Sequence, residues 1–225
     1  MTATTEQPVV AASRLETWRG RVDYQGIILG VVCTLITLLL LIGARMTADA
    51  IAQRTAEDRL AILNQVLPAT RYDNNPLADA IKVEDASSPG TAVDVYVARQ
   101  NGEFSGAAFQ TVTNGYGGPI SLMLGIDENG ALLGVRVLAH KETPGLADKI
   151  EIGRSAWITS FDGHSLSNTS KRQWAVKKDG GDFDQFTGAT ITPRAMVKGV
   201  YEGLQFFDRQ QAVIRAAQNV QGKEE

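Results

Sequence analysis

The chain has 225 residues, with 22 Lys and Arg against 25 Asp and Glu, which gives a formal net charge of −3. This length suits one domain of ordinary size with appendages, and no basic excess is present of the kind that binds a nucleic-acid backbone, so no nucleic-acid partner is expected. One cysteine, Cys33, and two histidines are too few for a thiolate-bound iron–sulfur cluster or a structural zinc site, so any redox chemistry needs an organic cofactor and no metal is expected.

Residues 26–44 form a run of nineteen residues without a charged side chain. Such a run matches the roughly 20 residues that a helix needs to cross the bilayer core. A buried core helix and a cleaved signal peptide are the alternatives, and Ala48 and Ala50 would supply a small-residue cleavage site. The run is longer than the roughly 7 to 15 residues of a signal core, which favours an uncleaved anchor. We therefore expect a tail at 1–25 and a transmembrane helix at 26–45.

The charges beside this segment do not give its orientation. Three arginines precede it and three follow it at a similar distance, so the positive-inside count is a tie. A short cytoplasmic tail with the long domain outside is the simplest arrangement, because long domains are translocated largely regardless of their charge.

The segment after the apolar run has a helical period. Apolar residues at intervals of three to five predict a helix with one apolar face, which ends near Pro68; these residues are Ile51, Ala56, Leu60, Leu63 and Leu67. Residues 72–91 are rich in Asn, Asp, Pro, Ser and Gly, which predicts a loop. Residues 46–91 are therefore expected to be a helix and a linker.

From residue 92 the period changes to two, which is typical of half-buried strands. Four strands are predicted, at "TAVDVYVAR", "GAAFQTVT", "ISLMLGID" and "ALLGVRVLA", with the last two joined by a hairpin turn at "DENG". Consecutive strands joined in this way imply an antiparallel sheet. An α+β domain is expected at 92–217, followed by a tail at 218–225.

A closing helix follows the strands. Thr192 is predicted to cap it and Pro193 suits its first position. Its apolar residues recur at helical spacing and are expected to face the sheet: Met196, Val200, Leu204, Phe207 and Ile214.

Small and hydroxylated residues lie directly before this helix, in "DQFTGATITP". Unpaired N–H groups at a helix start favour an anion, and a phosphate is the natural occupant. Gly188 and Ala189 keep side-chain bulk away from such a ligand. An ordinary turn before a helix explains the pattern as well. Nucleophilic catalysis by Thr187 or Thr190 is not indicated, because no base is near in sequence.

Two further stretches could line a site. "NGYGGPI" places Gly115, Gly117 and Gly118 around Tyr116 between two predicted strands, which permits close backbone approach beside an aromatic ring. Its spacing is not that of a dinucleotide-binding fingerprint. "HKETPGLADK", residues 140–149, offers polar groups at a strand end. Turns and a solvated loop remain open as simpler explanations.

These three motifs, in this order behind one apolar segment, resemble the RnfG family of Rnf electron-transport complexes, over most of the chain. A relative in the same FMN-binding domain family is NqrC of the sodium-translocating NADH:quinone reductase. The resemblance implies that the domain at 92–217 carries a covalent FMN, with its phosphate esterified to Thr190. It also implies that Asp184 and Thr187 belong to the pattern read by a separate flavin transferase, so the chain needs no catalytic residue of its own.

By the same resemblance, the flavin ring lies near Glu142, Thr143 and Leu146, and the Gly115–Gly118 turn forms another wall. The cofactor-binding set is completed by Gly188, Ala189 and Thr192 around the attachment point. Ala147 departs from the glycine expected in many relatives, which bears on how closely its loop can approach the flavin.

The resemblance implies an electron-relaying flavoprotein subunit of an ion-translocating ferredoxin:NAD⁺ oxidoreductase. Its expected partners are the other membrane and iron–sulfur subunits, the flavin transferase and membrane lipid. The FMN domain is expected on the periplasmic side of the bacterial cytoplasmic membrane. The alternatives are a quinone-reductase-type subunit and a non-redox, membrane-tethered binding or assembly domain.

Overall fold

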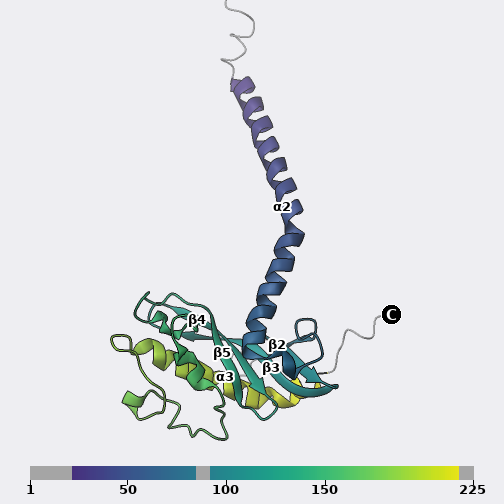
Figure 1. Ribbon diagram of the computed structural model, residues 1–225. Coiled ribbons are helices and arrows are strands. Elements are labelled where there is room, and N and C mark those ends of the chain that lie inside the picture. The colour runs from purple at the N-terminus through teal and green to yellow at the C-terminus, as the bar shows by residue number, and fades with distance from the viewer. Residues whose placement is uncertain (1–21, 85–91, 218–225) are drawn as a thin grey trace, which may run out of the picture. The chain divides into compact units, whose positions relative to one another are not determined.

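The computed structural model describes residues 22–84 and 92–217 (Figure 1). The C-terminal tail expected at 218–225, and all but the last four residues of the tail expected at 1–25, lie outside these ranges. Two compact units divide the chain, Met1–Ala56 and Glu57–Glu225.

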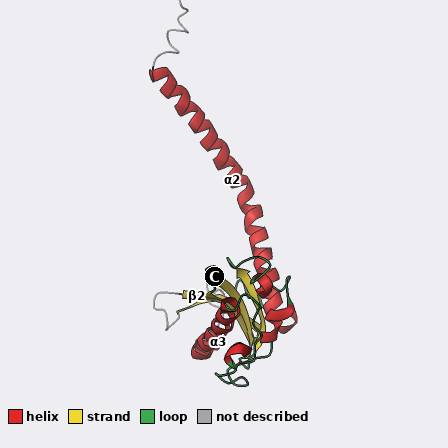
Figure 2. Cartoon of the chain, turned by 90° about the vertical axis from the view of Figure 1, so that its left-hand side faces the viewer, coloured by secondary structure: helices red, strands yellow, loops and turns green. Residues whose placement is uncertain are grey.

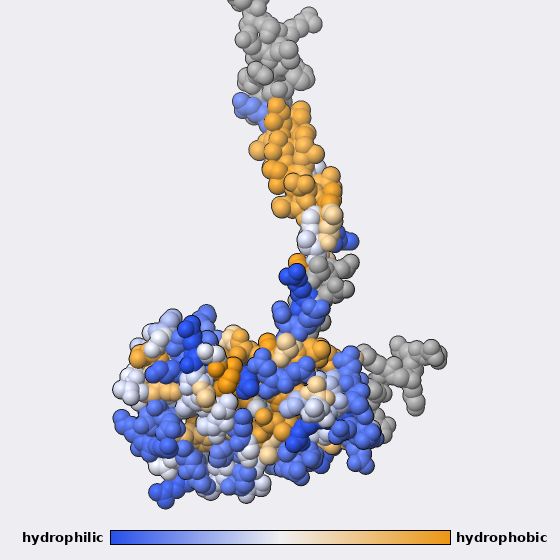
Figure 3. All heavy atoms as spheres, in the orientation of Figure 1, coloured by the Kyte–Doolittle hydropathy of each residue, from blue (hydrophilic) through white to orange (hydrophobic). Residues whose placement is uncertain are grey.

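The first unit contains most of helix α2 (Val22–Val66). Its stretch Gln25–Ala48 is long and apolar enough to cross a membrane, and Figure 3 shows hydrophobic side chains around this part of the helix. The hydroxyls of Thr34 and Thr37 donate to the carbonyls of Gly30 and Cys33 at 2.8 Å. These polar groups are therefore satisfied within the helix, as a lipid environment requires.

The second unit is built on a five-stranded antiparallel sheet in the order β1-β2-β3-β4-β5. Four predicted strands are confirmed, with the "DENG" turn between the last two; they are β2 (Ala92–Gln100), β3 (Glu103–Asn114), β4 (Pro119–Asp127) and β5 (Leu132–Ala139).

The prediction of a loop throughout residues 72–91 is wrong, because this segment contains the edge strand β1 (Ala80–Glu84). Its backbone pairs with β2, with Ile81 opposite Val95 and Val83 opposite Val93. Two alternating apolar residues among turn-forming neighbours are a weak local signal, so pairing with β2 decides the conformation.

The two faces of the sheet are covered by different helices. Helix α3 (Ile191–Ala216) packs against one face, as Figures 1 and 2 show. The last turns of α2 pack against the other face, where Leu63 and Val66 join Ala108 and Met123 in a second apolar cluster. A Cβ at Gly125 of β4 would lie 1.9 Å from the carbonyl oxygen of Val66, so glycine allows this direct contact.

The predicted apolar face of α3 is confirmed, since Met196, Val200, Leu204, Phe207 and Ile214 are all buried. The predicted start of the helix is wrong. The helix begins at Ile191 with Thr190 as N-cap, so Thr192 is not the cap and Pro193 is the third helical residue. Proline is tolerated there because N–H groups of the first turn have no partner within the helix.

Residues 140–190, between β5 and α3, contain only short 3₁₀ helices: η2 (Asp148–Ile150), η3 (Ala156–Phe161) and η4 (Lys177–Asp179). Aromatic rings pack together within this segment, for example that of Trp157 with those of Phe161 and Phe186 at 5.3 and 5.0 Å. The segment is joined to α3 by the rings of Trp174 and Tyr201, whose centroids lie 5.7 Å apart. Connections of this length usually carry function. Here the segment supplies two walls of a cavity.

Candidate functional site

A cavity of about 400 Å³ lies at the start of α3. Three separate segments form it, namely the β3–β4 turn, the loop after β5 and the junction between the 186–189 turn and α3. Its lining residues are Tyr116, Glu142, Thr143, Leu146, Ala147, Gly188, Ala189, Thr190, Ile191 and Thr192.

The β3–β4 turn is closed by the N–H of Gly115, which donates to the carbonyl oxygen of Gly118 at 2.8 Å. A Cβ at Gly117 would lie 1.9 Å from the carbonyl oxygen of Lys141. The backbone of the turn therefore rests on the backbone of the loop after β5, and glycine is required for that contact. Tyr116 at the tip is 72 % exposed beside the cavity.

Glu142 is a buried carboxyl group, 4 % exposed, in the wall of the cavity. Its Oε1 accepts a hydrogen bond from the N–H of Gly117 at 2.8 Å, and its Oε2 accepts one from the hydroxyl of Thr192. Within residues 22–84 and 92–217, no lysine or arginine forms an ion pair with this carboxyl group. These two charge-assisted hydrogen bonds therefore offset the cost of burying the carboxylate.

The three threonines of the motif before α3 have different surroundings. Thr192 is fully buried and donates to Glu142. Thr187 is exposed and does not line the cavity. Thr190 lines the cavity, is half-buried, and its hydroxyl makes no capping hydrogen bond. Of the three, Thr190 is the one that lines the cavity with a hydroxyl that neither caps the helix nor bonds to Glu142.

The 186–189 turn is shaped by Gly188, whose φ of +83° favours glycine. A Cβ there would also lie 3.2 Å from Cδ1 of Leu146, so the turn closely approaches the loop after β5. The backbone N–H of Ala189 closes the turn by donating to the carbonyl oxygen of Phe186 at 3.2 Å.

Several residues predicted for the site do not line the cavity. Gly115, Gly117 and Gly118 support it through the turn described above. Asp184 lies outside it, where its carboxylate is 66 % exposed and pairs with Lys177 at 2.7 Å. Ile191 lines the cavity and was not predicted, because nothing but its place between two candidate threonines marks it in the sequence.

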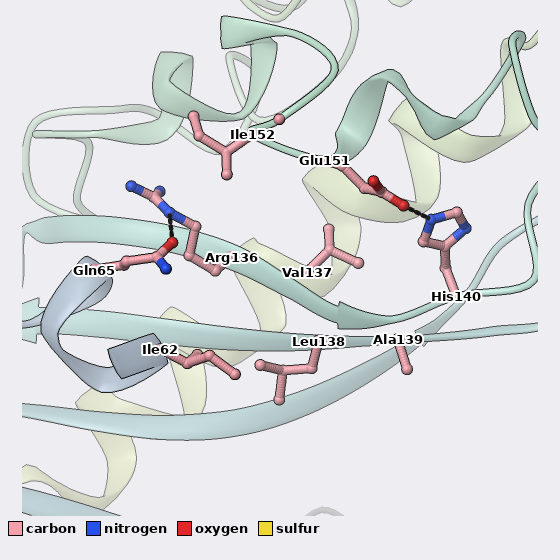
Figure 4. Close-up of a pocket in the computed structure, with 10 residues that line it drawn as sticks. Ile62, Gln65, Arg136, Val137, Leu138, Ala139, His140, Glu151 and Ile152 are labelled. Atoms are coloured by element: carbon pink, nitrogen blue, oxygen red, sulfur yellow. Dashed lines mark hydrogen bonds and ion pairs between the residues drawn. The ribbon is translucent and has the colours of Figure 1, made fainter. Parts of the chain in front are cut away.

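A second cavity, of about 460 Å³, is lined by residues of α2, of β5 and of the segment after β5 (Figure 4). His140 lines it, and its Nε2 lies 2.6 Å from Oε1 of Glu151. The backbone N–H of Glu142 donates to Nδ1 of His140 at 3.0 Å. Nδ1 therefore carries no proton and Nε2–H donates to Glu151. The wall of this second cavity thus fixes the backbone of a residue in the first.

The first cavity has the features that an FMN requires. The free N–H groups at the start of α3 suit a phosphate. The hydroxyl of Thr190, which makes no capping hydrogen bond, lies in the cavity wall at this helix start. Apolar side chains around the cavity are exposed, with Leu146 at 40 % and Ile191 at 49 %, and offer a surface for a planar ring. Bound there, FMN would supply one- or two-electron transfer.

Comparison with known proteins first gives the class. The family model described as the FMN-binding domain matches residues 115–205, from the β3–β4 turn into α3, so the protein carries an FMN-binding domain. NqrC of Shewanella oneidensis has a similar structure, with a TM-score of 0.44 and 17% identity over 66% of this chain and 72% of that one.

Relatives of higher identity give the family. The chain is 56% identical to the G subunit of the ion-translocating oxidoreductase complex from Stutzerimonas stutzeri, over 91% of this chain and 89% of that protein. It is 45% identical to the protein of the same name from Cereibacter sphaeroides, over 88% and 90%. The chain belongs to this family, the RnfG proteins of ion-translocating oxidoreductase complexes, as its motifs predicted.

Proposed function

We propose that this protein is the membrane-anchored flavoprotein subunit of an ion-translocating Rnf complex and carries FMN as a phosphoester on Thr190. In the attachment step, the hydroxyl of Thr190 loses its proton as Oγ1 bonds to phosphorus. The bond from phosphorus to the leaving group of an activated flavin nucleotide breaks, and a separate transferase supplies both the nucleotide and the catalysis.

One observation carries the choice of residue. Thr190 lines the cavity at the start of α3 with a hydroxyl that is free of a capping bond, whereas Thr192 donates to Glu142 and Thr187 lies outside the cavity. Esterification of Thr192 would remove one of the two hydrogen bonds to a buried carboxylate, at a cost of about 1.5–3 kcal/mol. Esterification of Thr190 leaves this pair intact.

The chain's own residues would then hold the cofactor. The N–H groups of the first turn of α3 would bind the phosphate. Leu146 and Ile191 offer apolar contact to the ring, and Glu142 and Thr143 offer polar groups beside it. The attachment leaves the ring unmodified, so its potential depends on these neighbours and on burial.

The test is mass spectrometry of the full-length protein made together with a flavin transferase. We expect the tryptic fragment containing Thr190 to carry one added FMN, and the denatured protein to give a fluorescent band in a gel. Thr190→Val removes both signals, whereas Thr190→Ser keeps a hydroxyl and retains them. An unmodified wild-type fragment beside an active transferase would refute the proposal and favour a non-redox binding or assembly domain.

The names of the relatives support a place in an ion-translocating oxidoreductase complex, and we propose the other membrane and iron–sulfur subunits, the transferase and lipid as partners. We also propose a ferredoxin:NAD⁺ reaction for the assembled complex, rather than quinone reduction. Copurification in mild detergent tests this, since iron–sulfur partners are expected and quinone-reductase subunits would contradict it.

We further propose that the FMN domain lies on the periplasmic side of the membrane. The test uses Ala78→Cys, at an exposed position, in a Cys33→Ala background. A membrane-impermeant maleimide should label this cysteine in spheroplasts. Labelling only after lysis would place the domain in the cytoplasm.

A further inference from the structure

We propose that Glu142 is a positioning residue that holds the flavin acceptor site in its final shape before FMN is attached. Its carboxylate joins the β3–β4 turn and the first turn of α3 to the loop after β5. This inference rests on the proposed attachment at Thr190 and adds how the chain prepares that hydroxyl for an external transferase.

The first argument is that each carboxylate oxygen bonds a different segment. Oε1 accepts from Gly117 in the β3–β4 turn, and Oε2 accepts from Thr192 in α3. Because Glu142 is 4 % exposed, water cannot readily replace either donor. A buried carboxylate without donors is costly, so the three segments stabilise each other's positions through this one group.

The second argument concerns the distance along the chain from Thr192 to Thr190. The two residues are separated by Ile191 alone, and all three line the same cavity. Fixing the side chain of Thr192 against Glu142 fixes the rotation of the first turn of α3 about its axis. The hydroxyl of Thr190 is thereby presented at the cavity without a capping bond of its own.

The third argument is that the backbone of Glu142 is itself fixed by a hydrogen bond to His140. Its backbone N–H donates to Nδ1 of His140, and His140 is held by Glu151 in the wall of the second cavity (Figure 4). The carboxylate therefore extends from a fixed backbone. All of these contacts are made by the chain's own residues, so we expect them in the flavin-free protein as well.

The test compares three full-length variants before and during flavin attachment. Thr192→Val removes the hydroxyl donor with little change of shape, and Thr192→Ser restores it. Thr113→Val is the matched control, because Thr113 is also buried and donates to α3, at the carbonyl oxygen of Ala195 at 3.0 Å, away from Glu142.

Two measurements are made on each variant. One is the rate at which purified transferase adds FMN to the flavin-free protein, followed by intact mass. We expect Thr192→Val to be slower by about 10- to 100-fold, the equivalent of one lost hydrogen bond to a charged group, while Thr192→Ser and Thr113→Val stay close to wild type. The other is hydrogen exchange of residues 115–118 and 188–194 without flavin, which should accelerate in Thr192→Val alone.

Glu142→Met provides a check on mechanism. Its side chain has a similar length but lacks both carboxylate acceptors, so it should slow attachment at least as much as Thr192→Val does. The double variant should be little worse than Glu142→Met alone, because both substitutions remove the link between these two residues. Fully additive effects would overturn the inference. So would a Thr192→Val protein that behaves like Thr113→Val in both measurements. If wild type itself accepts no FMN, the proposed function fails, and hydrogen exchange alone still decides whether Glu142 holds the site.

Discussion

Gly117→Ala tests whether the β3–β4 turn must rest on the loop after β5. A Cβ at this position would lie 1.9 Å from the carbonyl oxygen and 2.7 Å from the carbonyl carbon of Lys141, both rigid backbone atoms. Ordinary contact begins near 3.4 Å, so the turn and the loop would have to separate by more than an ångström. That separation also breaks the 2.8 Å hydrogen bond from Gly117 to Glu142.

The expected cost follows from these two effects. Overpacking a close contact costs about 1–3 kcal/mol, and the lost hydrogen bond to a carboxylate costs about 1.5–3 kcal/mol. Since the two share one displacement, we expect about 3 kcal/mol in total, or a melting temperature lower by roughly 6–12 °C for a domain of this size. Differential scanning fluorimetry of the full-length protein in mild detergent measures it.

The matched control is Gly153→Ala, because a Cβ there meets nothing within 4 Å and its φ is not in the left-handed region. This variant should melt within about one or two degrees of wild type, as surface substitutions usually do. Equal melting temperatures for the two alanine variants would refute the reasoning, since they would show that the turn adapts without loss.

Two further predictions concern hydrogen bonds around the site. His140→Asn places an acceptor near the position of Nδ1 and should retain protection of the Glu142 amide in hydrogen exchange. His140→Gln places its polar group near the position of Nε2, so the Glu142 amide should lose its protection. Equal protection in the two variants would contradict the tautomer with its proton on Nε2. Hydrogen bonds from Arg194 at 2.6 and 2.7 Å lower the pKa of Asp179. The stability from this pair is present above the ordinary aspartate pKa of about 3.9 and is lost as pH falls through the lowered value. A carboxyl NMR titration should show that pKa return to its usual range in Arg194→Met, and an unchanged titration would contradict the assignment.

Periodicity was sufficient where a whole element repeats one pattern. The four longer strands and the buried face of α3 each present many apolar residues at a regular spacing, so local sequence and tertiary packing agree. Strand β1 has only Ile81 and Val83 as regular apolar positions, and its conformation comes from pairing with β2. Pairing of this kind depends on residues elsewhere in the chain and is therefore absent from any local window.

The start of α3 shows a different limit of prediction from the local sequence. A threonine followed by proline predicts a cap at Thr192 and a first turn at Pro193. In the structure that hydroxyl donates to Glu142, fifty positions earlier in the chain, and the helix begins at Ile191. Local capping rules could not predict this, because the competing acceptor is a buried carboxylate brought in by the fold. Thr190 and Thr192 nevertheless both line the same cavity.

The same motif divides into two halves that face different surroundings. Asp184 and Thr187 are exposed and outside the cavity, where a separate enzyme could contact them. Thr190 and Thr192 lie in the cavity wall. The hydroxyl of Thr190 makes no capping hydrogen bond, and that of Thr192 donates to Glu142. An acceptor that is modified by another protein needs both properties, because the recognised residues must be reachable while the modified hydroxyl must already lie where the cofactor will stay. The division therefore agrees with the proposed attachment of FMN to Thr190 in the folded domain.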